Sequence, residues 1–152
     1  MKKLLLTLIT VFTMNINTYA QSPQSDVQKV IEILFDGMRA GDSGMVSKAF
    51  STDAIMQTVA KNEAGETVVK QTELAKFLDI VGTPRDEVLD ERITSYDIKV
   101  DGDLASAWTP YQFYIGEKFS HCGVNSFQLV KTSGQWKIVF IIDTRRKDDC
   151  VK

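Results

Sequence analysis

The chain has 152 residues, of which 18 are Lys or Arg, 20 are Asp or Glu, and 43% are hydrophobic. This length is typical of a single domain with one hydrophobic core. The formal net charge of −2 argues against general nucleic-acid binding, which depends on a clustered basic surface.

The N-terminus has the three-part pattern of a secretory signal peptide over residues 1–20. Two lysines precede an apolar stretch over residues 4–12, and the small-residue sequence Thr18-Tyr19-Ala20 follows. The apolar stretch is shorter than the ~20 residues that a membrane-spanning helix needs. A lipid-anchored protein would need a cysteine where Gln21 stands. We therefore predict cleavage between Ala20 and Gln21 and export of residues 21–152, as one domain without a membrane anchor, to the periplasm or the medium.

The first half of this domain is predicted to contain three helices and one pair of strands. Ser25-Asp26-Val27-Gln28 has the form of a capping box, and apolar residues recur behind it at helical spacing up to Gly41. The other two helices are expected to begin near Asp42 or Ser43 and at Thr72, and the two strands to span residues 54–60 and 66–70. Residues 85–91 are mostly charged, and we expect them to be exposed.

The second half is predicted to form a meander of four antiparallel strands. These strands span residues 92–100, 103–114, 118–130 and 135–147. Asp101-Gly102 is a strong hairpin signal, and Pro110 indicates a bulge or an edge position. One face of such a sheet needs a cover, which the amphipathic helices supply. The expected fold is therefore α+β: a curved, cone-shaped antiparallel sheet wrapped around N-terminal helices, with a pocket at its open end.

The sequence resembles the nuclear transport factor two-like superfamily, in particular its SnoaL-like and putative lumazine-binding branches. Four segments carry the resemblance: Gly37–Asp42, Ala49–Ala54, Ser120–Gly123 and Gly134–Ile138. They extend over essentially all of residues 21–152 in the order found in that superfamily. The resemblance implies the cone-shaped fold, and for relatives with a pocket His or Asp it implies cofactor-independent catalysis.

Strand register predicts which polar side chains face the pocket. Opposed residues of an antiparallel pair share a face, so matching the apolar faces pairs Leu129 with Trp136. This register places three polar side chains on the inner face: His121, Asn125 and Thr144. It places Asp143 on the outer face.

His121 is the only histidine, and its unperturbed pKa lies closest to neutrality. It is a candidate proton shuttle or ligand donor, with Asn125 orienting the ligand; the alternative is a histidine whose hydrogen bonds are satisfied within its strand. Trp108 and Tyr111 are candidates for the wall of a pocket that holds a flat organic ligand. The alternative for these aromatics is core packing and a dimer surface. Apolar residues on both faces of the second and fourth meander strands predict a homodimer.

The chain contains no G-x-S-x-G, H-E-x-x-H or phosphate-binding glycine loop. One histidine and two cysteines do not predict a metal site, and we expect no cofactor. Our first hypothesis is a non-catalytic domain that binds a small organic ligand. The second is a cofactor-independent isomerase, cyclase or dehydratase that uses His121 as its acid or base. A purely structural or interaction domain is the third.

Cys122 and Cys150 are the only cysteines, and in an oxidising compartment such a pair favours a disulfide. The predicted register places Cys122 opposite Asp143. A straight strand would then put Cys150 roughly 23 Å away. The disulfide therefore requires the tail to leave the sheet after about Arg145 and to fold back. An intermolecular bridge or two free thiols are the alternatives.

Overall fold

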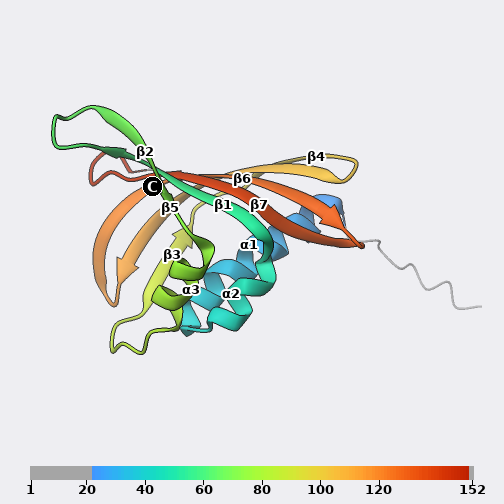
Figure 1. The fold of residues 1–152 in the computed structure, drawn as a ribbon, viewed down its shortest axis with the longest axis horizontal. Coiled ribbons are helices and arrows are strands. Elements are labelled where there is room, and N and C mark those ends of the chain that lie inside the picture. The colour runs from blue at the N-terminus through green and yellow to red at the C-terminus, as the bar shows by residue number, and fades with distance from the viewer. Residues whose placement is uncertain (1–21, 151–152) are drawn as a thin grey trace, which may run out of the picture.

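The computed structural model describes residues 22–150, in which three helices lie against one face of a curved sheet (Figure 1). The expected signal peptide lies outside the described residues. The helices are α1 (Pro23–Ala40), α2 (Ser43–Ala49) and α3 (Leu74–Gly82). None of these described helices is both long enough and apolar enough to cross a membrane.

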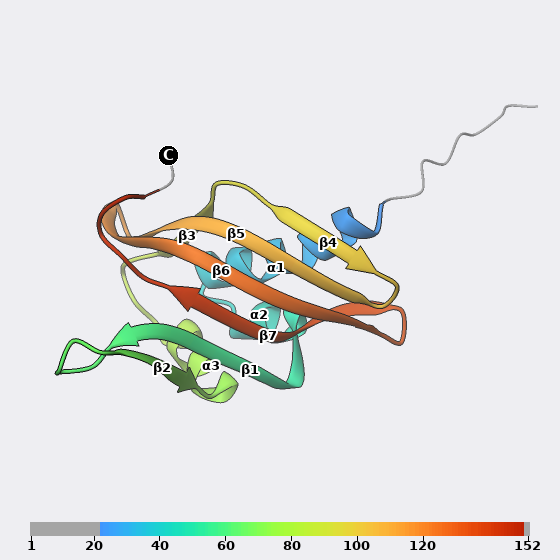
Figure 2. The same cartoon turned by 90° about the horizontal axis from the view of Figure 1, so that it is seen from above.

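The sheet has seven strands in the order β2-β1-β7-β6-β5-β3, and β4 also pairs with β5. The strands are β1 (Phe50–Lys61), β2 (Thr67–Thr72), β3 (Leu89–Ile93), β4 (Asp97–Asp101), β5 (Leu104–Ile115), β6 (Lys118–Thr132) and β7 (Gln135–Thr144). All pairs are antiparallel except β1 and β7, which run parallel and join the first strand pair to the meander. The sheet arches over the helices, and its other face is left uncovered (Figures 1 and 2). The predicted α+β class and curved sheet are confirmed, and the parallel pair is an addition to them.

Two helix starts differ from the predicted ones. Ser22 caps α1 by accepting a hydrogen bond of 3.2 Å from the Ser25 backbone N–H, so the predicted cap residue lies inside the helix. Pro23 follows at the position where a missing N–H costs nothing. Asp42 caps α2, as predicted, by accepting from the Met45 N–H at 2.8 Å. Thr72, the expected cap of α3, instead ends β2.

The predicted strand over residues 92–100 is divided into β3 and β4. β3 begins at Leu89, inside the segment that we expected to be exposed, and the two strands pair with different halves of β5. Pro110 lies between these two ladders, where its carbonyl accepts a hydrogen bond of 2.9 Å from the Thr94 N–H. The N–H and C=O groups of a strand residue point to the same side. The missing N–H of Pro110 therefore falls in the gap and costs no ladder hydrogen bond.

The core lies between α1 and the central strands. Val27, Ile31 and Leu34 repeat at helical spacing along α1 and are almost fully buried. They belong to the same cluster as Phe127, which is fully buried on β6 and meets the Phe35 ring edge-on, with the ring centroids 6.3 Å apart. Each of these side chains contributes roughly 1.5–3 kcal/mol by its removal from water.

The pairing of β6 with β7 differs from the predicted register near the turn. Leu129 pairs with Ile138 rather than with Trp136. This shift of two residues leaves the same apolar side chains facing the helices, because side chains alternate with a period of two. Both Trp136 and Ile138 are buried, as expected for the inner face.

A bulge on β7 then exchanges the faces of the rest of that strand. The register shifts between Gln128 and Leu129, so that Asn125 pairs with Asp143 and not with Phe140. A bulge adds one residue to one strand, and a shift of one residue turns every later side chain to the opposite face. Asp143 therefore faces the helices, which corrects its predicted outward position, and Thr144 turns away from them.

The predicted disulfide is confirmed, with the Cys122 and Cys150 α-carbons 5.8 Å apart. The residue opposite Cys122 is Arg146 rather than Asp143, and the two backbones exchange hydrogen bonds of 2.8 Å. Only three residues then lie between Arg146 and Cys150. The tail curls back beyond the end of β7, as Figure 2 shows. Asp149, at φ 53°, lies in this turn.

Candidate functional site

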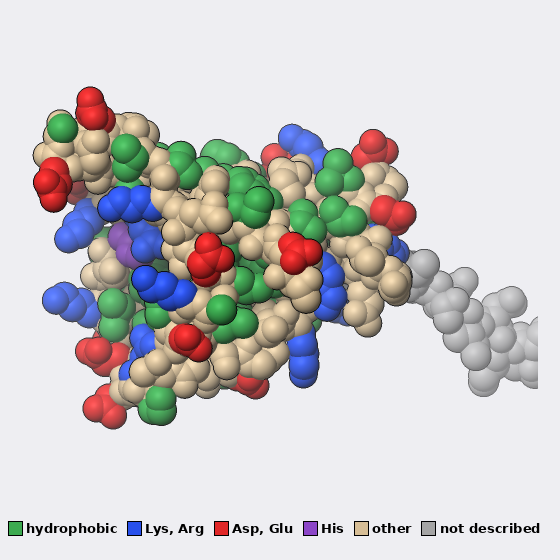
Figure 3. All heavy atoms as spheres, in the orientation of Figure 1, with side chains coloured by type: hydrophobic (Ala, Val, Ile, Leu, Met, Phe, Trp, Pro, Cys, Tyr) green, Lys and Arg blue, Asp and Glu red, His purple; other side chains and the backbone are tan. Residues whose placement is uncertain are grey.

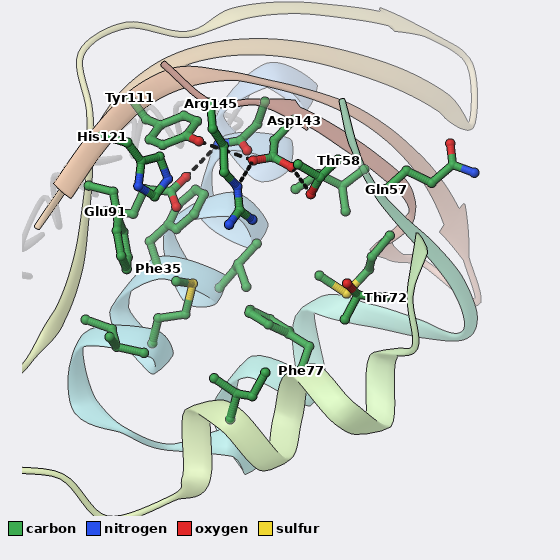
Figure 4. Close-up of a pocket in the computed structure, with 18 residues that line it drawn as sticks. Phe35, Gln57, Thr58, Thr72, Phe77, Glu91, Tyr111, His121, Asp143 and Arg145 are labelled. Carbon is green, nitrogen blue, oxygen red and sulfur yellow. Dashed lines mark hydrogen bonds and ion pairs between the residues drawn. The ribbon is translucent and has the colours of Figure 1, made fainter. Parts of the chain in front are cut away.

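A cavity of about 300 Å³ lies between the inner face of the sheet and the helices (Figure 4). Its helical side is apolar and is formed by Leu34, Phe35, Met38, Phe77 and Ile80. Its sheet side carries most of the polar groups, which are Glu91, Tyr111, His121, Asn125, Asp143 and Arg145. This volume is at the lower end of the range for small-molecule sites, and apolar walls with a few polar groups are typical of them.

Asp143 is the centre of the polar wall and has three hydrogen-bond donors. The Thr58 hydroxyl donates to Oδ1, and the Tyr111 hydroxyl shares its one hydrogen between Oδ2 at 3.2 Å and the Thr144 carbonyl at 3.0 Å. The Arg145 Nε also donates to Oδ2, at 2.8 Å. Only 8% of the Asp143 surface is exposed, so these partners take the place of the water that a carboxylate requires.

Arg145 places a cation at the cavity. Its guanidinium projects away from the sheet into the cavity, as the close-up shows (Figure 4). Burial lowers the pKa of Arg145, but the hydrogen bond and the charge of Asp143 raise it by more, and the pKa lies above its usual value. Arg145 is therefore a fixed positive charge that Asp143 holds by one of its three nitrogens.

Glu91 is the second carboxyl of the cavity, and among residues 22–150 one donor is recorded for its side chain. The Asn125 Nδ2 donates to Glu91 Oε1 at 2.7 Å. Burial raises the pKa of Glu91 to about 7; the bond from Asn125 opposes this rise, and the nearby charge of Asp143 adds to it. Glu91 therefore exchanges a proton near neutral pH, within a closed hydrogen-bonded pair.

His121 lies at the mouth of the cavity between two aromatic rings. Its ring centroid is 5.0 Å from that of Phe113 and 5.8 Å from that of Tyr111. Its Nδ1 lies 3.0 Å from the Ser120 hydroxyl. Burial, and then the positive charge of Arg145, lower the pKa of His121, so the ring is neutral at pH 7. In the space-filling view the histidine reaches the surface among Lys and Arg side chains (Figure 3).

Three of the five predicted ligand-binding residues line the cavity: Tyr111, His121 and Asn125. Thr144 is not among the lining residues, because of the bulge on β7, although its carbonyl accepts a hydrogen bond of 3.0 Å from the Tyr111 hydroxyl. Trp108 lies on the uncovered face of the sheet with 54% of its surface exposed, so it does not form part of the pocket wall.

Sequence reasoning missed Glu91, Asp143 and Arg145. A signal for Glu91 was present in the sequence. Leu89 and Ile93 lie two residues before and two residues after it, so Glu91 shares the apolar face of the strand with them. The predicted register placed Asp143 on the outer face, and Arg145 entered only as the point after which the tail leaves the sheet. Within residues 22–150, no group of three or more His, Cys, Asp or Glu side chains is placed to hold a metal ion.

Comparison with known proteins identifies one family model, described as "Putative lumazine-binding", which matches residues 22–140. The comparison with curated proteins found no match. Many solved structures share the fold. One is a nuclear transport factor two-like protein of unknown function from Shewanella baltica, with a TM-score of 0.59 and 16% identity, covering 90% of this chain and 100% of that one.

Two similar structures come from Novosphingobium aromaticivorans. The first is a nuclear transport factor two-like protein with a cystatin-like fold, with a TM-score of 0.66 and 13% identity, covering 82% of each chain. The second is described as the beta subunit of a putative aromatic-ring-hydroxylating dioxygenase; it has a TM-score of 0.66 and 15% identity, and the match covers 82% of this chain and 89% of that one. At this level of identity these structures establish the fold alone.

Proposed function

Because the chain belongs to the putative lumazine-binding family, within the nuclear transport factor two-like superfamily, we propose that its cavity binds a small organic molecule without converting it. One observation carries the proposal: the cavity has an apolar floor of helix side chains opposite a polar wall on the sheet. A ligand with an apolar body and a few polar atoms fits both surfaces. The family name supplies one compound to test, lumazine.

The polar wall supports binding rather than catalysis. Asp143 already accepts three hydrogen bonds, and the neutral His121 lies beside the Ser120 hydroxyl. A general acid or base has to be within reach of the substrate and has to exchange a proton at the working pH. The three donors already engage both oxygens of Asp143, which leaves this carboxylate poorly placed to take a proton from a substrate.

One observation favours the alternative of cofactor-independent acid–base catalysis. Glu91 lines the cavity with its pKa raised by burial to about 7, which suits proton exchange at neutral pH. If the domain is an isomerase, cyclase or dehydratase, Glu91 takes the role that the sequence suggested for His121. Turnover by the wild-type protein that Glu91→Gln abolishes, with ligand affinity retained, would favour this second function.

A thermal-shift screen tests the binding proposal. Purified protein is screened against lumazine and other bicyclic aromatic compounds, and a ligand of the folded state raises the midpoint of unfolding. Ile80→Trp adds bulk at a lining residue that is 45% exposed, and it should abolish the shift. Val88→Trp is the matched control, because Val88 is 44% exposed and is not a lining residue. Equal shifts of the unfolding midpoint in both variants would show that the ligand binds outside this cavity.

Export and self-association belong to the same proposal. The Cys122–Cys150 disulfide is compatible with an oxidising compartment, and the mature protein is then residues 21–152. Intact-mass measurement of protein from the periplasm or the medium tests this: a mass that retains residues 1–20 contradicts it.

We also propose a homodimer that forms through the uncovered face of the sheet.

A further inference from the structure

We propose that the ligand of the cavity is an organic anion, an aromatic or aliphatic body with one carboxylate, and that the carboxylate binds the terminal nitrogens of Arg145. This inference rests on the proposed binding function and adds the chemical class of the ligand. It depends on how Asp143 holds Arg145 and on which atoms of the guanidinium remain available.

Asp143 leaves most of the guanidinium unused. Arg145 contacts it through Nε alone, at 2.8 Å. Among the described residues, the structure records no hydrogen bond from Nη1 or Nη2 of Arg145. Thr58 and Tyr111 supply the other donors to Asp143, so this carboxylate does not need those two nitrogens. The two terminal nitrogens of the guanidinium, Nη1 and Nη2, thus remain as a fork of hydrogen-bond donors.

The fork points toward the apolar side of the cavity. In the close-up the Arg145 guanidinium extends from the sheet toward the helical side of the cavity, where Phe77 of α3 lies (Figure 4). A carboxylate matches such a fork in geometry and charge. An apolar body attached to it would lie against Phe77 and its apolar neighbours. The arrangement therefore selects for an anionic group at one end of the ligand and apolar surface at the other.

The other charges of the cavity permit an anion. Asp143 and Arg145 offset each other, and His121 is neutral at pH 7 because its pKa is lowered. Glu91 has a pKa of about 7 and is uncharged below that pH. Around Glu91 lie Tyr111, His121, Asp143 and Arg145 in the cavity, and Glu32, Asp36, Arg39, Arg92 and Tyr96 in an adjoining groove. Of these groups, Glu91 is the one with a pKa raised to about 7, so anion binding should weaken from pH 6 to pH 8.

A matched pair of probes tests the inference: 2-naphthoate and its neutral counterpart 2-naphthamide, titrated calorimetrically at pH 6. We expect the carboxylate to bind at least about tenfold more tightly than the amide, which is the usual effect of a charge-assisted hydrogen bond. Arg145→Gln should remove this preference and leave amide binding within about threefold of the wild type. Arg145→Lys, which keeps the charge without the fork, should retain part of the preference.

Lys147→Gln is the control, because it also removes one positive charge but is not a lining residue. It should keep the tenfold preference. If wild-type protein binds the two probes equally, or if Arg145→Gln leaves the preference intact, the anion inference is wrong while the binding function stands. If neither probe binds, the anion inference and the proposed binding function are both wrong. The pH dependence is a separate readout: naphthoate affinity should fall less from pH 6 to pH 8 in Glu91→Gln than in the wild type.

Discussion

Glu91 on β3 and Asn125 on β6 are joined by a hydrogen bond of 2.7 Å across the inner face of the sheet, although 34 residues separate them in the sequence. The bond runs over β5, which lies between their two strands. Asn125 is 3% exposed, so its amide has little access to water. Glu91 supplies the acceptor that the buried amide requires, and the amide fixes the position of the carboxyl.

This pair leads to a prediction about pH and stability. Burial raises the pKa of Glu91 from 4.5 to about 7 in the folded protein. The folded state therefore holds more protons than the unfolded state between these two values, and the free energy of unfolding falls as the pH rises through them. We expect Glu91→Gln to gain stability relative to the wild type from pH 4.5 to pH 8, by roughly 3 kcal/mol in total.

Urea unfolding followed by circular dichroism at several pH values measures the difference. Glu63→Gln is the control, because it removes one carboxylate from the exposed turn between β1 and β2. It should follow the wild type throughout this range. A constant difference between Glu91→Gln and the wild type from pH 4.5 to pH 8 would show that the Glu91 carboxyl is ionised alike in both states.

Gly123 gives a second prediction, because β6 and β7 approach closely there. A Cβ at this position would lie 1.8 Å from the carbonyl oxygen of Thr144, the same oxygen that accepts a bond from the Tyr111 hydroxyl. The backbone of β7 would have to move. We expect Gly123→Ala to lower the free energy of unfolding by about 3 kcal/mol, at the upper end for overpacked cores.

The matched substitution is Gly44→Ala in the first turn of α2. There the nearest atom to the new Cβ is Asp42 Oδ1 at 3.2 Å, which has to give way by only a few tenths of an ångström while it keeps its bond from the Met45 N–H. A change within about 1 kcal/mol is expected. Denaturant unfolding compares the two variants, and equal effects would mean that the approach of β7 to Gly123 does not constrain the fold.

The sequence predicted those parts of the site that depend on simple alternation. His121 and Asn125 were placed correctly because both follow the alternation of β6 from the buried Phe127. The bulge interrupts the alternation of inward and outward side chains on β7. An extra residue turns every later side chain over, and no turn residue or proline marks its position between Ile138 and Phe140. For that reason the faces predicted for Asp143 and Thr144 were both wrong: Asp143 points inward and Thr144 outward.

Glu91 was missed because charged residues were assumed to be solvated. Asp90 beside it is 9% exposed and pairs with Arg39 of α1 at 2.8 Å and with Arg92 at 2.6 Å. Partners 51 residues apart, such as Asp90 and Arg39, cannot be read from the local sequence. The helices, the turns and the order of most strands could be predicted, since they follow from local spacing.

The disulfide supports a third prediction. It closes a loop of 28 residues in sequence separation, and a cross-link of this length stabilises a fold by roughly 3–4 kcal/mol through loss of chain entropy in the unfolded state. Cys150→Ser should therefore lower the free energy of unfolding by that amount. This substitution is preferable to one at Cys122, which is 1% exposed and would bury a hydroxyl group.

Non-reducing peptide mapping first verifies that Cys122 and Cys150 are joined within one chain. A reducing agent should then destabilise the wild type and have no effect on Cys150→Ser. Two alkylatable thiols in freshly exported protein, or a stability that reduction does not change, would contradict the prediction.

The uncovered face of the sheet gives the last prediction. Four large apolar side chains on it are 43–55% exposed: Ile55, Val69, Leu104 and Trp108. Large apolar side chains that share one exposed face of a sheet make this face a candidate interface. We expect the protein to sediment as a dimer at micromolar concentration and Trp108→Glu to sediment as a monomer, since the carboxylate would be buried without a partner. Ile80→Glu, which changes an exposed apolar residue on α3, should remain dimeric. A wild-type protein that sediments as a monomer would remove the homodimer from the proposal.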